Sequence, residues 1–329
     1  MPKKQTNKKQ NNFTLKDKLF GFAELGRPVE WSKTLLNMTL AALMVYYIYA
    51  PIENEILVNF NLMVFIAGFI SVAFLWSSLY ALNDYTDWKI DKKHERKKFR
   101  PIPSGKVNPK QGLGFSLMLL IISFGIAFAL ESFFLLLCLS AMLINQLFYT
   151  TKPWRLKSRK YFDIISGSMI NPFFRYLSGI AIFVPGMLVT TTPFPIFPVL
   201  FVVGIQFSGY TLYRLFSKGH DKKLKMKSTV ASFPETHVKK VAYTVMIIAV
   251  LSYFGLIANS LFKISYLGFL PVQYLGAVII VVIVVLAVPA LRHAIINPQK
   301  ADLKNSYRIL YGMNIAFILG NAIIFFVLP

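Results

Sequence analysis

The feature that most constrains this chain is a series of long apolar segments separated by short polar ones. Nine windows of about 19 to 25 residues carry few or no charges, which is the length that an α-helix needs to cross a bilayer. The mean hydropathy of +0.54 over 329 residues agrees with this pattern. The sequence therefore predicts an all-α integral membrane protein with about nine transmembrane helices in one bundle. The predicted spans are residues 32–50, 58–82, 111–130, 132–150, 161–184, 193–217, 239–259, 267–291 and 307–328.

The positive charge of the chain follows this predicted topology. Except for Arg175 and Lys263, the 36 Lys and Arg residues lie in the N-terminus and in every second loop, which is the positive-inside pattern. We therefore expect a multi-pass protein of the cell membrane, with its N-terminus and basic loops in the cytoplasm and in contact with membrane lipids. A net charge of +22 that is distributed in this way requires no nucleic-acid partner.

The N-terminal region divides into two parts. Residues 1–12 are polar and rich in Lys, Asn and Gln, a composition typical of a disordered tail. Residues 13–30 have the pattern of a short amphipathic helix on the membrane surface, with Lys16 and Lys18 facing lipid headgroups. No small-residue cleavage site follows the basic start, so we expect the first apolar segment to be retained. The predicted organisation is a disordered tail over 1–12 and a single transmembrane domain over 13–329.

An acidic motif follows the second apolar segment. If the helix continues through it, Asp84, Asp87 and Asp91 lie at i, i+3 and i+7 and share one face. Carboxylates at this spacing repel one another unless a cation lies between them, and Mg²⁺ prefers carboxylate oxygen. The next nine residues contain six Lys or Arg and His94. Carboxylates for a metal, followed by cations for phosphate oxygens, are what a Mg²⁺-diphosphate requires.

Other polar residues lie near or within the predicted spans. Lys33 lies at the start of the first predicted span, where it is either an interfacial anchor or a phosphate ligand. Asp163 begins the fifth span and Arg175 lies about three turns further on. An arginine at membrane depth pairs or lines a wet cavity, so we expect Asp163 or a bound phosphate as its partner, unless it forms a purely structural pair.

A second loop also combines acidic and basic residues. Residues 217–229 contain Asp221 together with several lysines, and on its own this segment is equally typical of a solvated basic loop. The four histidines have no zinc spacing, and Cys138 is the only cysteine, which excludes an intramolecular disulfide. The sequence has no P-loop and no nucleophile elbow.

The acidic motif resembles a known family signature. Asn83-Asp84-x-x-Asp87-x-x-x-Asp91, followed by Arg100-Pro101-x-x-x-Gly105, is similar to the first signature of the UbiA superfamily of intramembrane prenyltransferases. Residues 149–157 with Asp163 also resemble that family's third loop and fifth helix. The resemblance implies nine helices around a lipid-accessible cavity, in which two aspartate-rich motifs hold Mg²⁺ and the diphosphate of an isoprenoid donor.

By position, the resemblance assigns roles to individual residues. Asp84, Asp87, Asp91 and Asp221 become the catalytic Mg²⁺ ligands. In the second motif Ser217 or Lys218 occupies the place of an earlier aspartate, which leaves fewer carboxylates for a second metal. The candidates for contact with the substrate are Asn83, Lys33, Arg96, Lys98, Arg100, Tyr149, Lys157, Asp163, Arg175 and Lys222.

Three functions stay open at this point. The resemblance implies transfer of a polyprenyl group from an isoprenyl diphosphate to an aromatic or lipid acceptor. The run from Asp91 to Pro101, with His94 and Lys97, looks most like a branch that contains decaprenyl-phosphate phosphoribosyltransferases, in which phosphoribosyl diphosphate is the donor and a polyprenyl phosphate the acceptor. A non-catalytic transporter or lipid-binding membrane protein is the third, although transporters more often show internal repeat symmetry.

Overall fold

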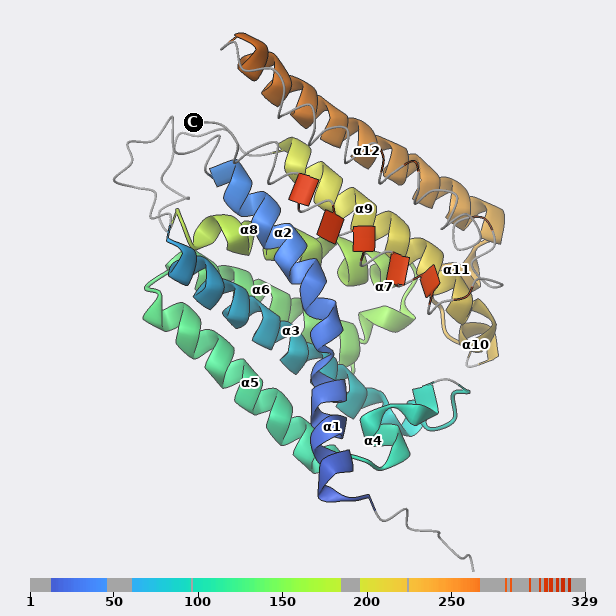
Figure 1. Cartoon of the computed structure of the whole chain (residues 1–329). Coiled ribbons are helices and arrows are strands. Elements are labelled where there is room, and N and C mark those ends of the chain that lie inside the picture. The colour runs from blue at the N-terminus through green and yellow to red at the C-terminus, as the bar shows by residue number, and fades with distance from the viewer. Residues whose placement is uncertain are drawn as a thin grey trace, which may run out of the picture.

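The chain folds into a bundle of helices (Figure 1). The computed structural model describes residues 13–45, 61–95, 97–184, 196–223 and 225–266, together with isolated residues beyond 281. Within these ranges the only strand-like pairing is a single bridge between Arg159 and Lys227. Five helical segments are long and apolar enough to cross a membrane, which agrees with the predicted all-α membrane fold. They are Leu62–Asp91, Pro109–Ala129, Phe133–Thr150, Ile196–Lys223 and Glu235–Gly255.

The elements follow the chain in order. The helices are α1 (Leu15–Gly26), α2 (Trp31–Met44), α3 (Leu62–Asp91), α4 (Pro101–Ser104), α5 (Pro109–Ala129), α6 (Phe133–Thr150), α7 (Phe162–Ile165), α8 (Asn171–Ala181), α9 (Ile196–Arg214), α10 (Lys218–Lys223), α11 (Thr229–Ser232) and α12 (Glu235–Tyr266). Short 3₁₀ turns lie at Pro28–Glu30, Lys97–Phe99, Leu156–Ser158 and Leu215–Ser217. Residues 1–12 and, apart from isolated residues, the predicted spans 267–291 and 307–328 lie outside the described ranges.

Reciprocal serine contacts fix the position of α3 against α5. Ser71 Oγ donates to the Ser123 carbonyl at 2.8 Å, and Ser123 Oγ donates to the Ser71 carbonyl at 2.7 Å. About two turns further along α3, Ser78 and Ser116 exchange the same pair of hydrogen bonds at 2.8 Å each. Small hydroxyl residues let two membrane helices approach closely and bond across the interface. These contacts set the register of α3 against α5, and therefore the position of the acidic end of α3 relative to α5.

Small residues also bring α2 against α8. A side chain at Gly179 would lie 2.6 Å from Ala41 Cβ and 2.8 Å from Met38 Cα, so only glycine allows this approach. The predicted fifth span is not one uniform helix, because α7 passes through a π-helical turn (Ser166–Ile170) into α8. Pro172 lies in the first turn of α8, and because proline lacks a backbone N–H it favours such a break in the ladder.

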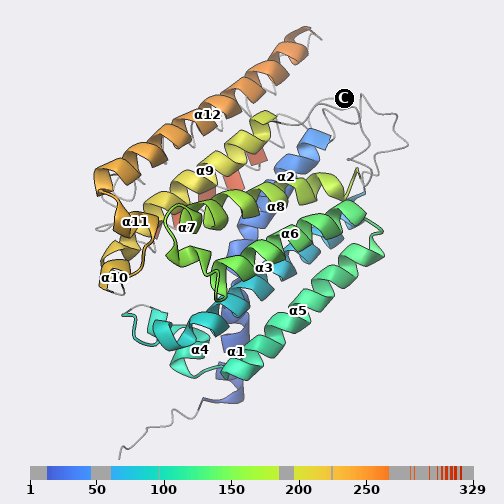
Figure 2. The same ribbon diagram turned by 180° about the vertical axis from the view of Figure 1, so that it is seen from behind.

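Several segments that are far apart in the sequence meet at one end of the bundle. The last turns of α3 lie at this end, and α4 and α10 flank it in both views (Figures 1 and 2). The rings of His94, just after α3, and His220, in α10, have centroids 4.2 Å apart. The two loops that combine acidic and basic residues are therefore neighbours in the fold.

Candidate functional site

The helix of the second apolar segment does continue through the acidic motif. α3 ends at Asp91, and the side chains of Asp84, Asp87 and Asp91 are all buried, as expected for three residues on one inward face. We call these three residues the α3 carboxylates. Buried ionised carboxylates require compensating charge, so the side chains around them define what the site can do.

Two arginines and a lysine surround Asp84 and Asp91, the first and last of the α3 carboxylates. Arg27, in the turn between α1 and α2, donates to Asp84 Oδ1 at 2.7 Å. Arg100 bridges the pair, with Nη1 2.9 Å from Asp84 Oδ1 and 2.9 Å from Asp91 Oδ2. Lys97 Nζ lies 3.6 Å from Asp91 Oδ1. The loop that follows the motif therefore folds back so that its cations face the carboxylates.

The middle carboxylate is bound from the loop after α6. Lys157 Nζ donates to Asp87 Oδ2 at 2.6 Å, and Arg155 Nη2 donates to Asp87 Oδ1 at 3.0 Å. Lys157 also donates to Asn83 Oδ1 at 3.1 Å and to Thr150 Oγ1 at 2.8 Å. Burial lowers the pKa of Lys157 to about 8, and Asp87 opposes this effect.

The imidazole beyond the end of α3 is neutral at neutral pH. Burial, together with the positive surroundings of His220, Lys97 and Arg100, lowers the pKa of His94 to about 4. His94 therefore adds no charge to a region in which five cations already face three carboxylates.

A second group of acidic side chains, Asp163 and Asp221, lies at the last residue of α9. Arg214 Nη2 is 2.7 Å from Asp221 Oδ2 and 3.5 Å from Asp163 Oδ2, so one guanidinium serves both carboxylates. Ser228 Oγ donates to Asp221 Oδ2 at 2.7 Å. The backbone N–H of Thr229 lies 3.2 and 3.1 Å from the two oxygens of Asp163, and the Thr229 hydroxyl also donates to Asp163. We call Asp163 and Asp221 the Asp163–Asp221 pair.

Two tyrosines lie beside this pair. The hydroxyls of Tyr149, near the end of α6, and Tyr210, in α9, are 2.6 Å apart. Gly167, in the π-helical turn, packs under Tyr210, because a side chain there would come within 2.8 Å of the ring. The tyrosine pair therefore joins α6, the π-helical turn and α9.

Of the partners expected for Arg175, Asp163 does not pair with it. Asp163 is bound by Thr229 and Arg214, whereas the Arg175 guanidinium carbon lies 4.0 Å above the ring of Trp76. The reason is tertiary: α11 and the end of α9 reach Asp163, while the π-helical turn separates Asp163 from Arg175 along the fifth span. A guanidinium over an indole face is a favourable contact for a buried cation.

Three of the remaining predicted substrate-contact residues lie outside this cluster. Lys33 pairs with Glu30 at 2.5 Å, near the start of α2. Lys98 is exposed and lies over the ring of Phe99, and Lys222 is exposed on α10. Arg96 is outside the described residues.

Sequence reasoning gave no site role to several residues that the fold brings to the carboxylates. Lys97 belongs to the run from Asp91 to Pro101 that carries the family resemblance, which was the available signal for it, and Arg27 lies in the basic stretch before the first predicted span. Arg155 lies two residues from the predicted Lys157, and Arg214 was visible only as a cation at the end of an apolar segment. No local pattern links Thr229 to Asp163, because their contact is long-range.

The donors present are of the kind that binds a hard divalent cation. The α3 carboxylates and the Asn83 amide oxygen offer oxygen ligands from one buried helix face, which suits Mg²⁺. In the part of the chain that the structure describes, however, no three acidic, His or Cys side chains converge as a metal cluster. Arginine and lysine side chains bridge the carboxylates instead, so a metal ion would bind in exchange for part of these contacts.

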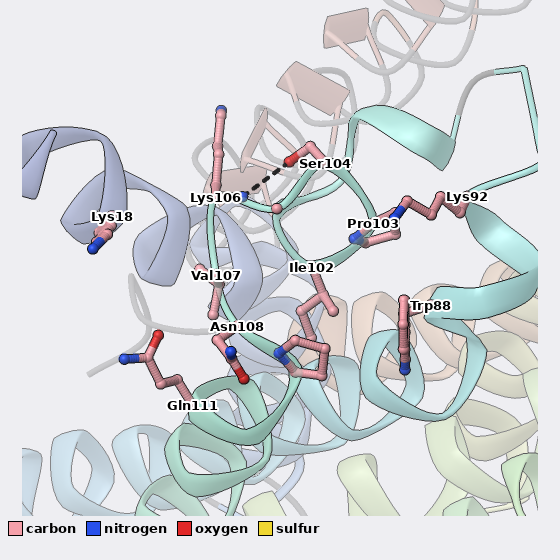
Figure 3. A pocket seen from close by; sticks show the side chains of 12 residues that line it. Lys18, Trp88, Lys92, Ile102, Pro103, Ser104, Lys106, Val107, Asn108 and Gln111 are labelled. Atoms are coloured by element: carbon pink, nitrogen blue, oxygen red, sulfur yellow. Dashed lines mark hydrogen bonds between the residues drawn. The ribbon is translucent and has the colours of Figure 1, made fainter. Parts of the chain in front are cut away.

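A separate pocket lies on the outer side of the motif loop (Figure 3). It has a volume of about 450 Å³ and is lined by α1, the end of α3, α4 and the start of α5. Lys18, Lys92 and Lys106 contribute its charge, and none of the α3 carboxylates lines it. The predicted roles of Asp84, Asp87 and Asp91 therefore do not involve this pocket.

Comparison with known proteins matches residues 38–318 to the UbiA prenyltransferase family. A "4-hydroxybenzoate octaprenyltransferase" of Pseudoalteromonas atlantica is 28% identical over 218 residues, which is 66% of this chain and 68% of the relative. A "protoheme IX farnesyltransferase" of Bdellovibrio bacteriovorus is 39% identical over 92 residues, which is 28% of this chain and only 30% of the relative.

A solved structure has the same fold. The UbiA homolog from Archaeoglobus fulgidus bound to GPP and Mg²⁺ superposes with a TM-score of 0.65 at 18% identity, covering 92% of this chain and 99% of that one. At this level of identity the likeness concerns the arrangement of helices.

Proposed function

Because the chain belongs to the UbiA prenyltransferase family, we propose that it is a Mg²⁺-dependent intramembrane enzyme that transfers a prenyl group from an isoprenyl diphosphate to an aromatic or lipid acceptor. The observation that carries the proposal is the cation-rich cluster on the α3 carboxylates. Five cationic side chains face three buried carboxylates, which leaves a net charge of +2 at the end of an apolar helix. A polyanionic diphosphate with an apolar tail matches both parts of this site.

The α3 carboxylates are the residues that would hold the metal, with Asn83 beside them. When bound, Mg²⁺ supplies Lewis-acid stabilisation of the negative charge on the diphosphate oxygens. Arg27 and Arg100 converge on one oxygen of Asp84, and their guanidinium N–H groups can turn from that carboxylate to phosphate oxygens.

The reaction requires that the diphosphate be positioned and that water be excluded from the reacting carbon. The allylic C–O bond breaks and the diphosphate leaves with the electron pair, while an acceptor nucleophile forms the new bond and loses a proton. Arg27, Lys97, Arg100, Arg155 and Lys157 stabilise the leaving diphosphate. The apolar interior above the site, with Leu75 and Leu79 fully or almost fully buried in α3, keeps water from the reacting carbon.

The charge pattern supports a proposal for which side of the membrane the site faces. The basic loops 83–110, 151–160 and 214–240 contribute Arg100, Arg155 and Arg214 to one end of the bundle. The positive-inside pattern supports the proposal that this end faces the cytoplasm, where soluble diphosphates are available.

The test is a comparison of donors with the full chain purified in detergent. Radiolabelled geranylgeranyl diphosphate or phosphoribosyl diphosphate is supplied with Mg²⁺, a membrane lipid extract, 4-hydroxybenzoate and a polyprenyl phosphate, and the label entering the organic phase is counted. We expect label only from the prenyl donor, and only with Mg²⁺.

Label from the sugar donor alone would replace the proposal with phosphoribosyl transfer. Binding of geranylgeranyl diphosphate in the presence of Mg²⁺ without transfer to any acceptor would favour a non-catalytic lipid-binding protein. Lys98→Gln is the matched control variant, because Lys98 is exposed on the same loop and contacts Phe99.

A further inference from the structure

The Asp163–Asp221 pair already has an internal cation. Asp163 comes from α7 and Asp221 from α10, and the guanidinium of Arg214 lies between them at 3.5 and 2.7 Å. The Arg214 side chain is only 12% exposed, and the two carboxylates are 0% and 4% exposed. A single buried positive charge thus occupies the position in which a divalent cation would bridge two carboxylates.

Three of the four carboxylate oxygens of this pair already accept hydrogen bonds. Asp221 Oδ2 accepts hydrogen bonds from Arg214 and from Ser228. Both oxygens of Asp163 face the Thr229 N–H, and one also accepts from the Thr229 hydroxyl. A cation such as Mg²⁺ requires near-octahedral oxygen coordination, so these donors would have to leave before it could bind.

The anchoring of Arg214 differs from that of the cations on Asp84 and Asp91. Arg214 is the last residue of α9, and α9 packs along α12 and against the π-helical turn. The cations on Asp84 and Asp91 come from turns and loops, and their side chains are 26% to 35% exposed. Arg214 is therefore held in place by the packing of α9, whereas the cations on Asp84 and Asp91 are free to move toward a ligand.

From this geometry we propose that Arg214 permanently replaces a divalent cation at the Asp163–Asp221 pair, so that of these two acidic groups only the α3 carboxylates bind divalent metal. The statement about the α3 carboxylates rests on the proposed function. Asp221, which the family resemblance assigns to the metal set, is then a positioning residue. It holds Arg214 and, through Ser228, the segment that carries Thr229 to Asp163.

The test counts bound Mn²⁺ by electron paramagnetic resonance on the full chain in detergent, with inorganic diphosphate as the probe. We expect Asp221→Asn to leave the number of bound Mn²⁺ ions per chain unchanged, and Asp91→Asn to lower it. Arg214→Gln should add one ion, because it leaves two adjacent carboxylates without their cation. Lys240→Gln, an exposed change on α12, is the control and should change nothing.

A second readout protects the test if Arg214→Gln folds poorly. Mn²⁺ should raise the midpoint of thermal unfolding of Arg214→Gln more than that of the wild type or of Arg214→Lys, because a ligand that binds only the folded state stabilises it. If Asp221→Asn lost a Mn²⁺ ion, the inference would be overturned while the proposed function remained.

The absence of any Mn²⁺ from the wild type would overturn the metal site at the α3 carboxylates but not the role of Arg214. A gain of one ion in Arg214→Gln would still support that role, and the absence of a gain would contradict it.

Discussion

The two acidic groups of this protein are close in the fold but differ in how their charge is balanced. The α3 carboxylates face five cations, a net charge of +2, whereas the Asp163–Asp221 pair faces one guanidinium, a net charge of −1. The cations of the first group come from three connecting segments and those on Asp84 and Asp91 are about a quarter to a third exposed. In the first group, the cations on Asp84 and Asp91 can therefore exchange their contacts for a ligand, whereas Lys157 on Asp87 is only 10% exposed. The second group holds helices together.

The largest effect should come from neutralising a carboxylate of the first group. Asp91→Asn should reduce prenyl transfer by about 10² to 10³-fold, because it removes a metal ligand while keeping the shape of the side chain. Transfer of radiolabel from geranylgeranyl diphosphate measures this, with Asp17→Asn as the control because Asp17 is exposed on α1. Asp91→Asn should remain folded and inserted, so near-normal transfer would show that the first group is not the metal site.

Removing a carboxylate of the second group should mainly lower the free energy of unfolding. Asp163→Ala leaves the buried Arg214 with one carboxylate and Thr229 without its acceptor, which should cost about 3 kcal/mol or more. Thermal unfolding of the purified protein in detergent measures the loss, and Asp91→Asn should show a smaller one. If Asp91→Asn were the less stable of the two variants, the division into an exchanging group and a structural group would fail.

An intermediate effect should follow from removing the arginine that bridges two α3 carboxylates. Arg100→Gln should weaken diphosphate binding by about 10 to 100-fold, as expected for a hydrogen bond to a charged group. The inhibition constant of inorganic diphosphate in the transfer assay reports this loss. Lys98→Gln, two residues away and exposed, should leave the constant unchanged, and an equal effect of both variants would indicate only general attraction by the basic loop.

The smallest effect should come from Lys33, which the sequence left as either an anchor or a phosphate ligand. Its side chain is 31% exposed and pairs with Glu30, so Lys33→Gln should change stability by at most about 1 kcal/mol. Transfer activity should stay within about twofold of the wild type, which corresponds to a few tenths of a kcal/mol. A loss of activity comparable to that of Arg100→Gln would instead make Lys33 a third type of cation, one that approaches the first group only with substrate bound.

Much of the membrane architecture was predictable because it depends on local chemistry. The apolar windows gave α3, α5, α6, α9 and α12, since a bilayer requires about 20 apolar residues in a helix. The spacing of Asp84, Asp87 and Asp91 predicted a shared face, because the 3.6-residue period fixes it once the helix continues. The π-helical turn within the fifth span was not predicted, although Pro172 was visible.

What the sequence by itself determined is which segments enter the membrane and to which family the chain is related, and it also predicted which residues carry the chemistry. These properties reside in composition, period and short patterns. Only the tertiary structure decided which cation meets which carboxylate: Arg27 and Arg100 on Asp84, Lys157 on Asp87, and Arg214 in place of Arg175 on Asp163. The physical reason is that such pairs join residues brought together by helix packing, and helix packing depends on the close approach of α3 to α5 and of α2 to α8.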